Sequence, residues 1–164
     1  MKRKRIFFDG YNLGLETGTG VATYARNLTY CAHDLGYEVD VLYGTRAAPK
    51  KSDLLREIAF FDPHVDDPVR VLKWTRWAKQ ISTSWMGLRA KHVPMTGAVI
   101  PTQFQSRMPY ADLFWNIPDL WGQIDRHEFM FGKPLIARLP RKADLMHWTY
   151  PIAAKVPGVK NIYT

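Results

Sequence analysis

The spacing of apolar and polar positions predicts a strand, a loop, a helix and a second strand near the start of the chain. Residues 6–8 are apolar, and turn-forming residues follow at 9–14. From residue 21 onward, apolar side chains recur every three or four positions, which is typical of the buried face of a helix. Gly36 stands where a helix C-terminal cap is expected, and residues 37–43 alternate as in a strand. The predicted buried face consists of Val21, Tyr24, Leu28, Cys31 and Leu35.

This opening predicts an α/β fold. Two strands joined through a helix pair in parallel by a right-handed crossover, so we expect a Rossmann-like, doubly wound parallel sheet. Residues 143–148 and 161–164 are interpreted as later strands, the first of which emerges at His147. A parallel strand needs cover on both faces, and no helix follows residues 161–164. We therefore expect residues 1–164 to form one domain that is truncated at its C-terminal end.

The middle of the chain is less regular. Residues 52–61 fit either a short helix or a strand. Residues 69–91 carry apolar positions spaced by three and four, with basic residues between them, and predict an amphipathic helix that Gly87 could interrupt. Residues 116–132 are rich in aromatic side chains and predict no defined element.

Composition limits the function classes. With 46% hydrophobic and 23% charged residues, the chain is an ordinary globular one. Its 23 basic and 15 acidic residues give a net charge of +8, which favours an anionic partner. The single cysteine, Cys31, excludes an intramolecular disulfide and indicates a cytoplasmic setting, and we expect it to be buried. No apolar run approaches the roughly 20 residues that span a bilayer, so any membrane contact would be peripheral, on the inner face of the plasma membrane.

Basic residues and tryptophans are concentrated between residues 69 and 91. No acidic residue occurs between Pro68 and Ala111. This pattern fits a helix lying at the surface of an acidic membrane. A packed helix with a solvated basic face explains it equally well, and RNA binding is a third option that no nucleic-acid-binding signature supports. The candidate residues for an anionic surface are Arg70, Lys73, Trp74, Arg76, Trp77, Lys79, Trp85, Arg89 and Lys91.

Two features could carry chemistry. Gly18, Thr19 and Gly20 precede a helix N-terminus, where free backbone N–H groups favour an anion such as a diphosphate, although a simple glycine turn is an equal alternative. A dinucleotide fingerprint is disfavoured because Thr23 replaces its third glycine, and no Walker lysine is present. His147, at an expected strand end, could hydrogen-bond a sugar hydroxyl or a phosphate, or pack under a loop. The other histidines have no metal-ligand spacing.

Five segments together resemble the N-terminal half of bacterial glycosyltransferases of family 4. They are DGYNL at 9–13, GTGVATYARNL at 18–28, LGYEV at 35–39, HWTYP at 147–151 and NIYT at 161–164. The resemblance covers both ends of the chain and is weak in its middle.

The resemblance implies a glycosyltransferase-B fold, in which this acceptor-side domain would face a separate C-terminal domain that binds a nucleotide sugar. It implies transfer of the sugar to an acceptor hydroxyl with retention of configuration, without an obligatory metal or other cofactor, in the assembly of bacterial surface polysaccharide. Gly18, Thr19 and Gly20 would approach the donor diphosphate and sugar. His147 would line the sugar site as the catalytic candidate. Asn12, Trp148 and Tyr150 would lie in the acceptor cleft.

Other functions remain open at the level of sequence. The donor-gripping residues of the C-terminal domain have no counterpart here, so we do not expect this chain to be active alone. The acceptor would be a saccharide or a lipid-linked saccharide, and an acidic membrane is a further expected contact, whereas nucleic acid is not. The main alternative is a non-enzymatic α/β module that docks on an anionic surface or RNA. A nucleotide-dependent epimerase or reductase is disfavoured by the missing third glycine.

Overall fold

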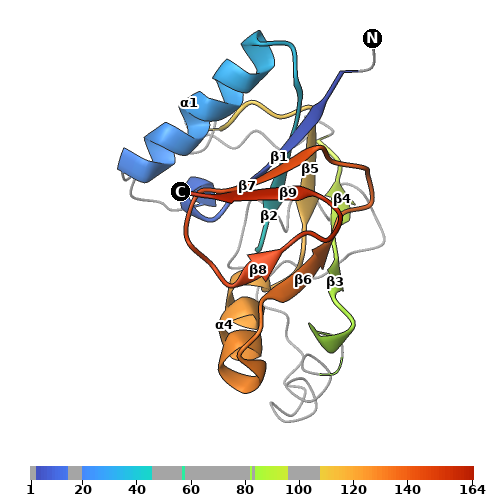
Figure 1. The fold of residues 1–164 in the computed structure, drawn as a ribbon. Coiled ribbons are helices and arrows are strands. Elements are labelled where there is room, and N and C mark those ends of the chain that lie inside the picture. Colours follow the sequence, from blue (N-terminus) through green and yellow to red (C-terminus); the bar gives the residue numbers. More distant parts are fainter. Residues whose placement is uncertain (1–2, 15–19, 46–56, 58–81, 83, 96–107) are drawn as a thin grey trace.

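A computed structural model describes residues 3–14, 20–45, 57, 82, 84–95 and 108–164. Figure 1 shows the described helices and strands. They are β1 (Arg5–Asp9), the 3-10 helix η1 (Asn12–Gly14), α1 (Gly20–Asp34), β2 (Glu38–Tyr43), β3 (Leu88–Arg89), β4 (Lys91–Val93), β5 (Leu113–Asn116), α4 (Leu120–Phe131), β6 (Leu135–Arg138), β7 (Leu145–Trp148), β8 (Ala154–Lys155) and β9 (Lys160–Tyr163).

A six-stranded sheet of order β4-β5-β2-β1-β7-β9 forms the centre of the molecule. All neighbouring strands pair in parallel except β4, which is antiparallel to β5 at one edge. The chain builds outward from β1 through β2 to β5, and later places β7 and β9 on the other side of β1. The predicted α/β fold with a mostly parallel sheet is therefore confirmed, and this strand order is compatible with a Rossmann-like domain.

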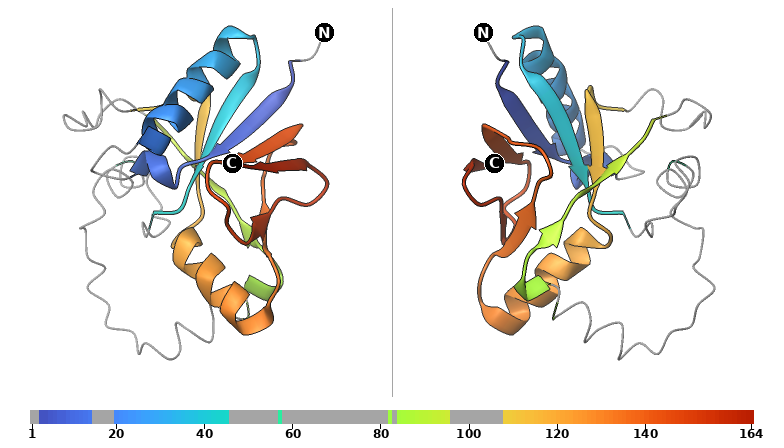
Figure 2. Two further views of the ribbon diagram at one scale, coloured as in Figure 1. Left: turned by 60° about the vertical axis from the view of Figure 1, so that its left-hand side comes forward. Right: turned by 90° about the vertical axis from the view of Figure 1, so that its right-hand side faces the viewer.

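Both faces of this sheet are covered. On one face, Phe8, Val39 and Val41 pack beneath α1 in one apolar cluster. On the other face, Phe7 and Met146 belong to a second cluster, which extends to α4 and to a small parallel sheet of order β3-β6-β8. Figure 2 shows α1 and α4 well separated, with the small sheet close to α4. Because β1 is buried from both sides, its central residues are all apolar, as expected for a parallel sheet.

Helix α1 buries a different face from the predicted one. Its buried side chains are Ala22, Ala25, Thr29 and Ala32. Of the five residues predicted to be buried, Cys31 is exposed and Leu35, just beyond the helix, is 76% exposed. Short side chains allow the helix to lie close to the strands, so size rather than hydrophobicity selects the inner face. The predicted C-terminal cap is confirmed, because Gly36 has a φ of 82° and its N–H bonds to the carbonyl of His33.

The predicted helix over residues 69–91 is wrong at its C-terminal end. Residues 69–81 lie outside the described part of the chain. Ser84 and Trp85 are helical, and Gly87 then takes a φ of 83°, which interrupts the helix as the sequence suggested. Arg89 and Lys91 follow on β3 and β4 instead of on the helix. A second correction is α4, since residues 116–132 contain a regular helix where none was predicted.

The predicted strands near the C-terminus are confirmed as β7 and β9, which pair in parallel. No helix among the described residues is both long and apolar enough to traverse a bilayer.

Candidate functional site

A candidate ligand site lies between β1 and β7, where the order in which strands are added to the sheet reverses its direction. Strands β1 and β7 are neighbours, but the chain leaves them toward opposite sides of the sheet. In open α/β sheets, ligands bind outside the carboxyl ends of the strands at this position. Here those ends are Asp9 and Trp148, and the loops that follow begin at Gly10 and Thr149.

Asp9 fastens the two loops to each other. Its carboxylate is fully buried and accepts hydrogen bonds from the backbone N–H of Tyr11, at 2.9 Å, and from that of Thr149. Burial raises the pKa of Asp9, while these backbone hydrogen bonds act in the opposite direction. The Nδ2 of Asn12 adds a bond of 3.3 Å to the carbonyl of Thr149. Asn12 therefore lies at this edge, where the residue is 94% buried and its amide joins the two loops.

Three aromatic rings meet at this edge and form what we call the aromatic platform: Tyr11 and Tyr150 on the two loops, and Trp121 in the first turn of α4. Tyr11 stacks on Tyr150 with ring centroids 5.3 Å apart and meets the edge of Trp121 at 5.1 Å. Tyr150 is 48% exposed. The platform joins segments that follow β1, β5 and β7, so the topology alone brings it together. Rings of this kind can bind the apolar face of a ligand.

Two glycines let aromatic rings lie against the backbone at this edge. A Cβ on Gly44, which follows β2, would come within 2.6 Å of the Trp121 indole. A Cβ on Gly10 would come equally close to the ring of Tyr43. Real Cβ atoms do not approach so closely, so an alanine at Gly44 would push Trp121 out of its position in the platform.

His147 directly precedes the last residue of β7, and its side chain is packed inside the fold. Its ring lies on the α1 side of the sheet, 5.5 Å from that of Phe8, and its residue is 92% buried. Burial lowers the pKa of His147, and its Nε2 is 3.1 Å from the Oγ1 of Thr164. The imidazole is therefore neutral at pH 7 and makes a hydrogen bond within the fold, which corresponds to the packed alternative more closely than to the catalytic one.

The side chain of Trp148 is also inaccessible to a ligand at this edge. Its side chain is fully buried in the cluster shared with α4, and its Nε1 donates a 3.0 Å hydrogen bond to the Oδ1 of Asn161. This location leaves the indole no surface for an acceptor. Of the three residues predicted for the acceptor cleft, Tyr150 alone presents an exposed side chain there.

The glycine segment is described only at its end. Gly18 and Thr19 lie outside the described residues. Gly20 is the first residue of α1, is exposed, and has open space where a Cβ would stand.

The basic stretch is described only in part as well. Arg70, Lys73, Trp74, Arg76, Trp77 and Lys79 lie outside the described residues. Trp85 is 64% exposed, with its ring 5.3 Å from that of Phe131, and Arg89 and Lys91 are exposed on their strands. In the described part of the chain, no group of three or more histidine, cysteine or acidic side chains is placed to hold a metal ion.

Asp9, Tyr11 and Trp121 are the members of the site that sequence reasoning did not single out. In the sequence, Asp9 is one of the turn-forming residues at 9–14, although a carboxylate directly after an apolar strand is a usable signal. Comparison with known proteins adds no assignment, because no family model, curated protein or solved structure matches the chain. Membership of glycosyltransferase family 4 stays a prediction from the sequence segments.

Proposed function

We propose that this chain forms the acceptor-side domain of a retaining glycosyltransferase of the glycosyltransferase-B type, and that a saccharide acceptor packs on the aromatic platform. The main support for the proposal is the contact between two of the segments that resemble family 4 glycosyltransferases. DGYNL ends β1 and HWTYP ends β7, and the contacts of Asp9 and Asn12 with Thr149 hold them together at the change in winding direction.

The chemistry of this edge is consistent with binding and orienting a sugar. The platform supplies flat apolar rings, and the hydroxyl groups of Tyr11 and Tyr150 supply polar partners. Among the described residues of this edge, Asp9 is buried and bonded to backbone amides, so its carboxylate is not free to act as a nucleophile or base. The domain would then contribute orientation of the acceptor, while a second domain would hold the nucleotide sugar. The free backbone N–H groups at the N-terminus of α1, at Gly20, would stabilise the leaving diphosphate.

Saturation-transfer NMR on the chain tests this proposal. The ligands are a panel of hexoses, N-acetylhexosamines, deoxyhexoses and their disaccharides at millimolar concentration. We expect transfer to at least one saccharide, and we expect Tyr150→Ala to abolish it because Tyr150, at 48% exposure, is the most exposed ring of the platform. The matched control is Tyr24→Ala, which deletes a tyrosine of similar exposure, 46%, from the outer face of α1.

Two results would overturn the acceptor-side role. One is the absence of saturation transfer to every saccharide in the panel. The other is equal loss of transfer in both variants, which would place the binding away from the platform.

A further inference from the structure

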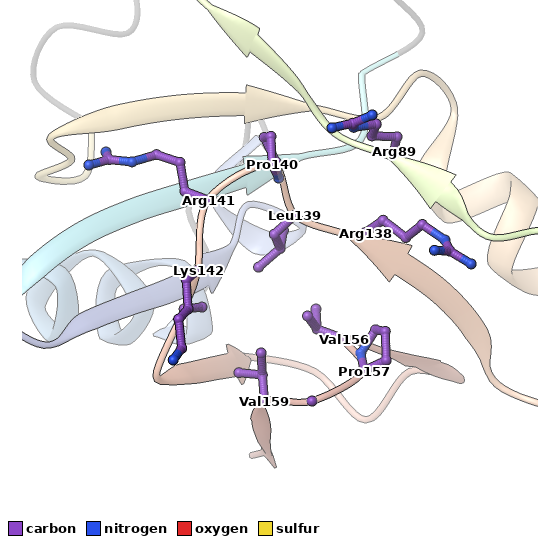
Figure 3. A pocket seen from close by; sticks show the side chains of 11 residues that line it. Arg89, Arg138, Leu139, Pro140, Arg141, Lys142, Val156, Pro157 and Val159 are labelled. Carbon is purple, nitrogen blue, oxygen red and sulfur yellow. The ribbon is translucent and has the colours of Figure 1, made fainter.

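A second concave site lies at the opposite edge of the sheet. It is a pocket of about 500 Å³ between the carboxyl ends of β3 and β6 and the connections from β6 to β7 and from β8 to β9 (Figure 3). We call it the basic pocket. Lys142 precedes β7 and Val159 precedes β9, so the pocket borders the amino ends of these strands. The candidate site described above lies at their carboxyl ends, so the two sites are separate.

The pocket carries four positive charges and no negative one. Arg89, Arg138, Arg141 and Lys142 line it, and no acidic residue does. Arg141 has partners outside the pocket, since its guanidinium lies 3.6 Å from Glu38. Within the described residues, the side chains of Arg89 and Lys142 have no ion-pair partner.

Strand register places two of these cations side by side. Arg89 on β3 and Arg138 on β6 are direct partners in the parallel pairing. Like charges at paired positions destabilise a sheet, so this pair costs stability unless an anion neutralises it. Figure 3 shows the two side chains directed away from each other, and the Nε of Arg138 donates to the carbonyl of Met86. Among the described residues no carboxylate pairs with either arginine, so their positive charge favours an anion in the pocket.

The floor of the pocket is apolar. Leu139 and Val156 point toward the space between the two connections, and Val159 lies beside them (Figure 3). The cations stand around this floor, so the pocket suits a ligand with an anionic head and an apolar or flat body. Its volume falls within the range of about 300–1,000 Å³ that is usual for small-molecule sites.

We propose that the basic pocket binds a phosphoryl group carried on an apolar or flat body. A phosphoryl group provides several acceptor oxygens and close to two negative charges, which suit a pocket lined by three arginines and a lysine with no acidic residue in its lining. The same chemistry is offered by a soluble phosphorylated metabolite and by the head group of an acidic phospholipid. The inference is independent of the glycosyltransferase proposal.

Calorimetric titration of the chain with three soluble probes tests the pocket chemistry. The probes are inorganic phosphate, phenyl phosphate and benzyl alcohol, at constant ionic strength. We expect phenyl phosphate to bind more tightly than inorganic phosphate, since only phenyl phosphate also covers the apolar floor, and benzyl alcohol not to bind. Sedimentation with vesicles of phosphatidylcholine, with and without phosphatidic acid, tests the lipid source. Binding in either arm supports the proposal and identifies the source, whereas binding in neither overturns it.

Charge-matched variants locate the binding. Arg89→Gln and Lys142→Gln each remove one pocket cation, and Lys133→Gln removes an exposed cation from the other end of β6. We expect each pocket variant to bind about tenfold more weakly, because one charge-assisted hydrogen bond is lost, and the control to stay within about twofold of the parent. Neither Arg89→Gln nor Lys142→Gln removes a side-chain hydrogen bond or ion pair within the described residues. Lys142→Gln should therefore melt like the parent, and Arg89→Gln should melt no lower, because it also relieves the like-charge pairing with Arg138. Equal weakening in all three would show a general charge effect and would overturn the site.

Discussion

Removal of the Asp9 carboxylate tests whether the candidate site is held together as the structure indicates. The Thr149 amide that it bonds is 98% buried, so in Asp9→Ala that donor is left without a partner. A buried unsatisfied donor costs about 1–3 kcal/mol. Loss of the hydrogen bond from the Tyr11 amide costs less, because Tyr11 is only partly buried and water can replace the lost acceptor. Relief of carboxylate burial offsets part of the loss, so we expect Asp9→Ala to lower the free energy of unfolding by about 2 kcal/mol.

Asp9→Asn should cost less than Asp9→Ala, because its amide oxygen still accepts one hydrogen bond. Urea unfolding followed by tryptophan fluorescence at pH 7 measures both variants. Asp125→Ala, an exposed residue of α4, serves as the control and should change stability by less than about 0.5 kcal/mol. A cost below about 0.5 kcal/mol for Asp9→Ala would refute the view that this carboxylate joins the two loops, and would leave it available for a ligand.

The pH dependence gives a second measurement on the same residue. The pKa of Asp9 is raised in the folded state, so the native protein binds the proton more tightly than the unfolded chain does. Its contribution to stability therefore falls as pH rises from the unfolded value of about 3.9 to the native value, and is constant above that. Asp9→Asn should lack this contribution. A pH profile identical to that of the parent below neutral pH would contradict the raised pKa.

Three further changes probe other parts of the structure. Because the Trp148 indole is in the core, Trp148→Ala should lower the free energy of unfolding in urea by about 3–5 kcal/mol, whereas Trp148→Phe should keep saccharide binding. Loss of saccharide binding in a stable Trp148→Phe variant would support the acceptor role of Trp148. Because the pKa of His147 is lowered in the folded state, the parent should lose stability as pH falls below about 6.5, and His147→Gln should lose less, with the remaining loss due to His127. Equal losses in melting temperature between pH 7.5 and 5 would argue against burial of the neutral ring. Gly44→Ala should cost about 1–3 kcal/mol and weaken saccharide binding by displacing Trp121, and unchanged stability and binding would show that the indole moves freely.

Sequence patterns predicted β1, α1, β2, β7 and β9 and missed α4 and the strands β3, β4, β5, β6 and β8. β1, β2, β7 and α1 each have either a continuous apolar run or a regular spacing with a glycine boundary. β3 and β8 contain two residues each, too few to show any period.

Helix α4 was missed for a different reason. Gln123 and His127 are on its buried side, while Phe129 is 89% exposed, so its polar and apolar positions are partly inverted. An amphipathic pattern cannot be recognised when the exposed face carries the large hydrophobic side chain. In α1, likewise, alanines occupy the inner face and larger apolar residues remain outside. In both helices, the buried face is determined by which side chains fit against the rest of the fold, and not by which are most hydrophobic.

The candidate site depends on contacts that no local pattern can show. Asp9 meets Thr149 across 140 positions of the chain, and Tyr11 meets Trp121 and Tyr150 across similar separations. Tyr150 and Asn12 were named from the resemblance, whereas Trp121 could be found only once β5 was placed beside β2. Strand order, more than residue type, therefore determines which polar and aromatic residues share an edge.

The distribution of charge distinguishes the two edges of the sheet. At the carboxyl edge, Asp9 is buried against backbone amides, and the exposed chemistry is aromatic. At the amino edge, Glu38 and Asp40 pair with Arg5 and Arg141, whereas Arg89, Arg138 and Lys142 of the basic pocket have no acidic partner among the described residues. A net charge of +8 therefore does not mean that the two edges attract the same ligands. Binding at the carboxyl edge would rest on ring stacking and be nearly independent of salt, whereas binding in the basic pocket would rest on charge and weaken as salt is added.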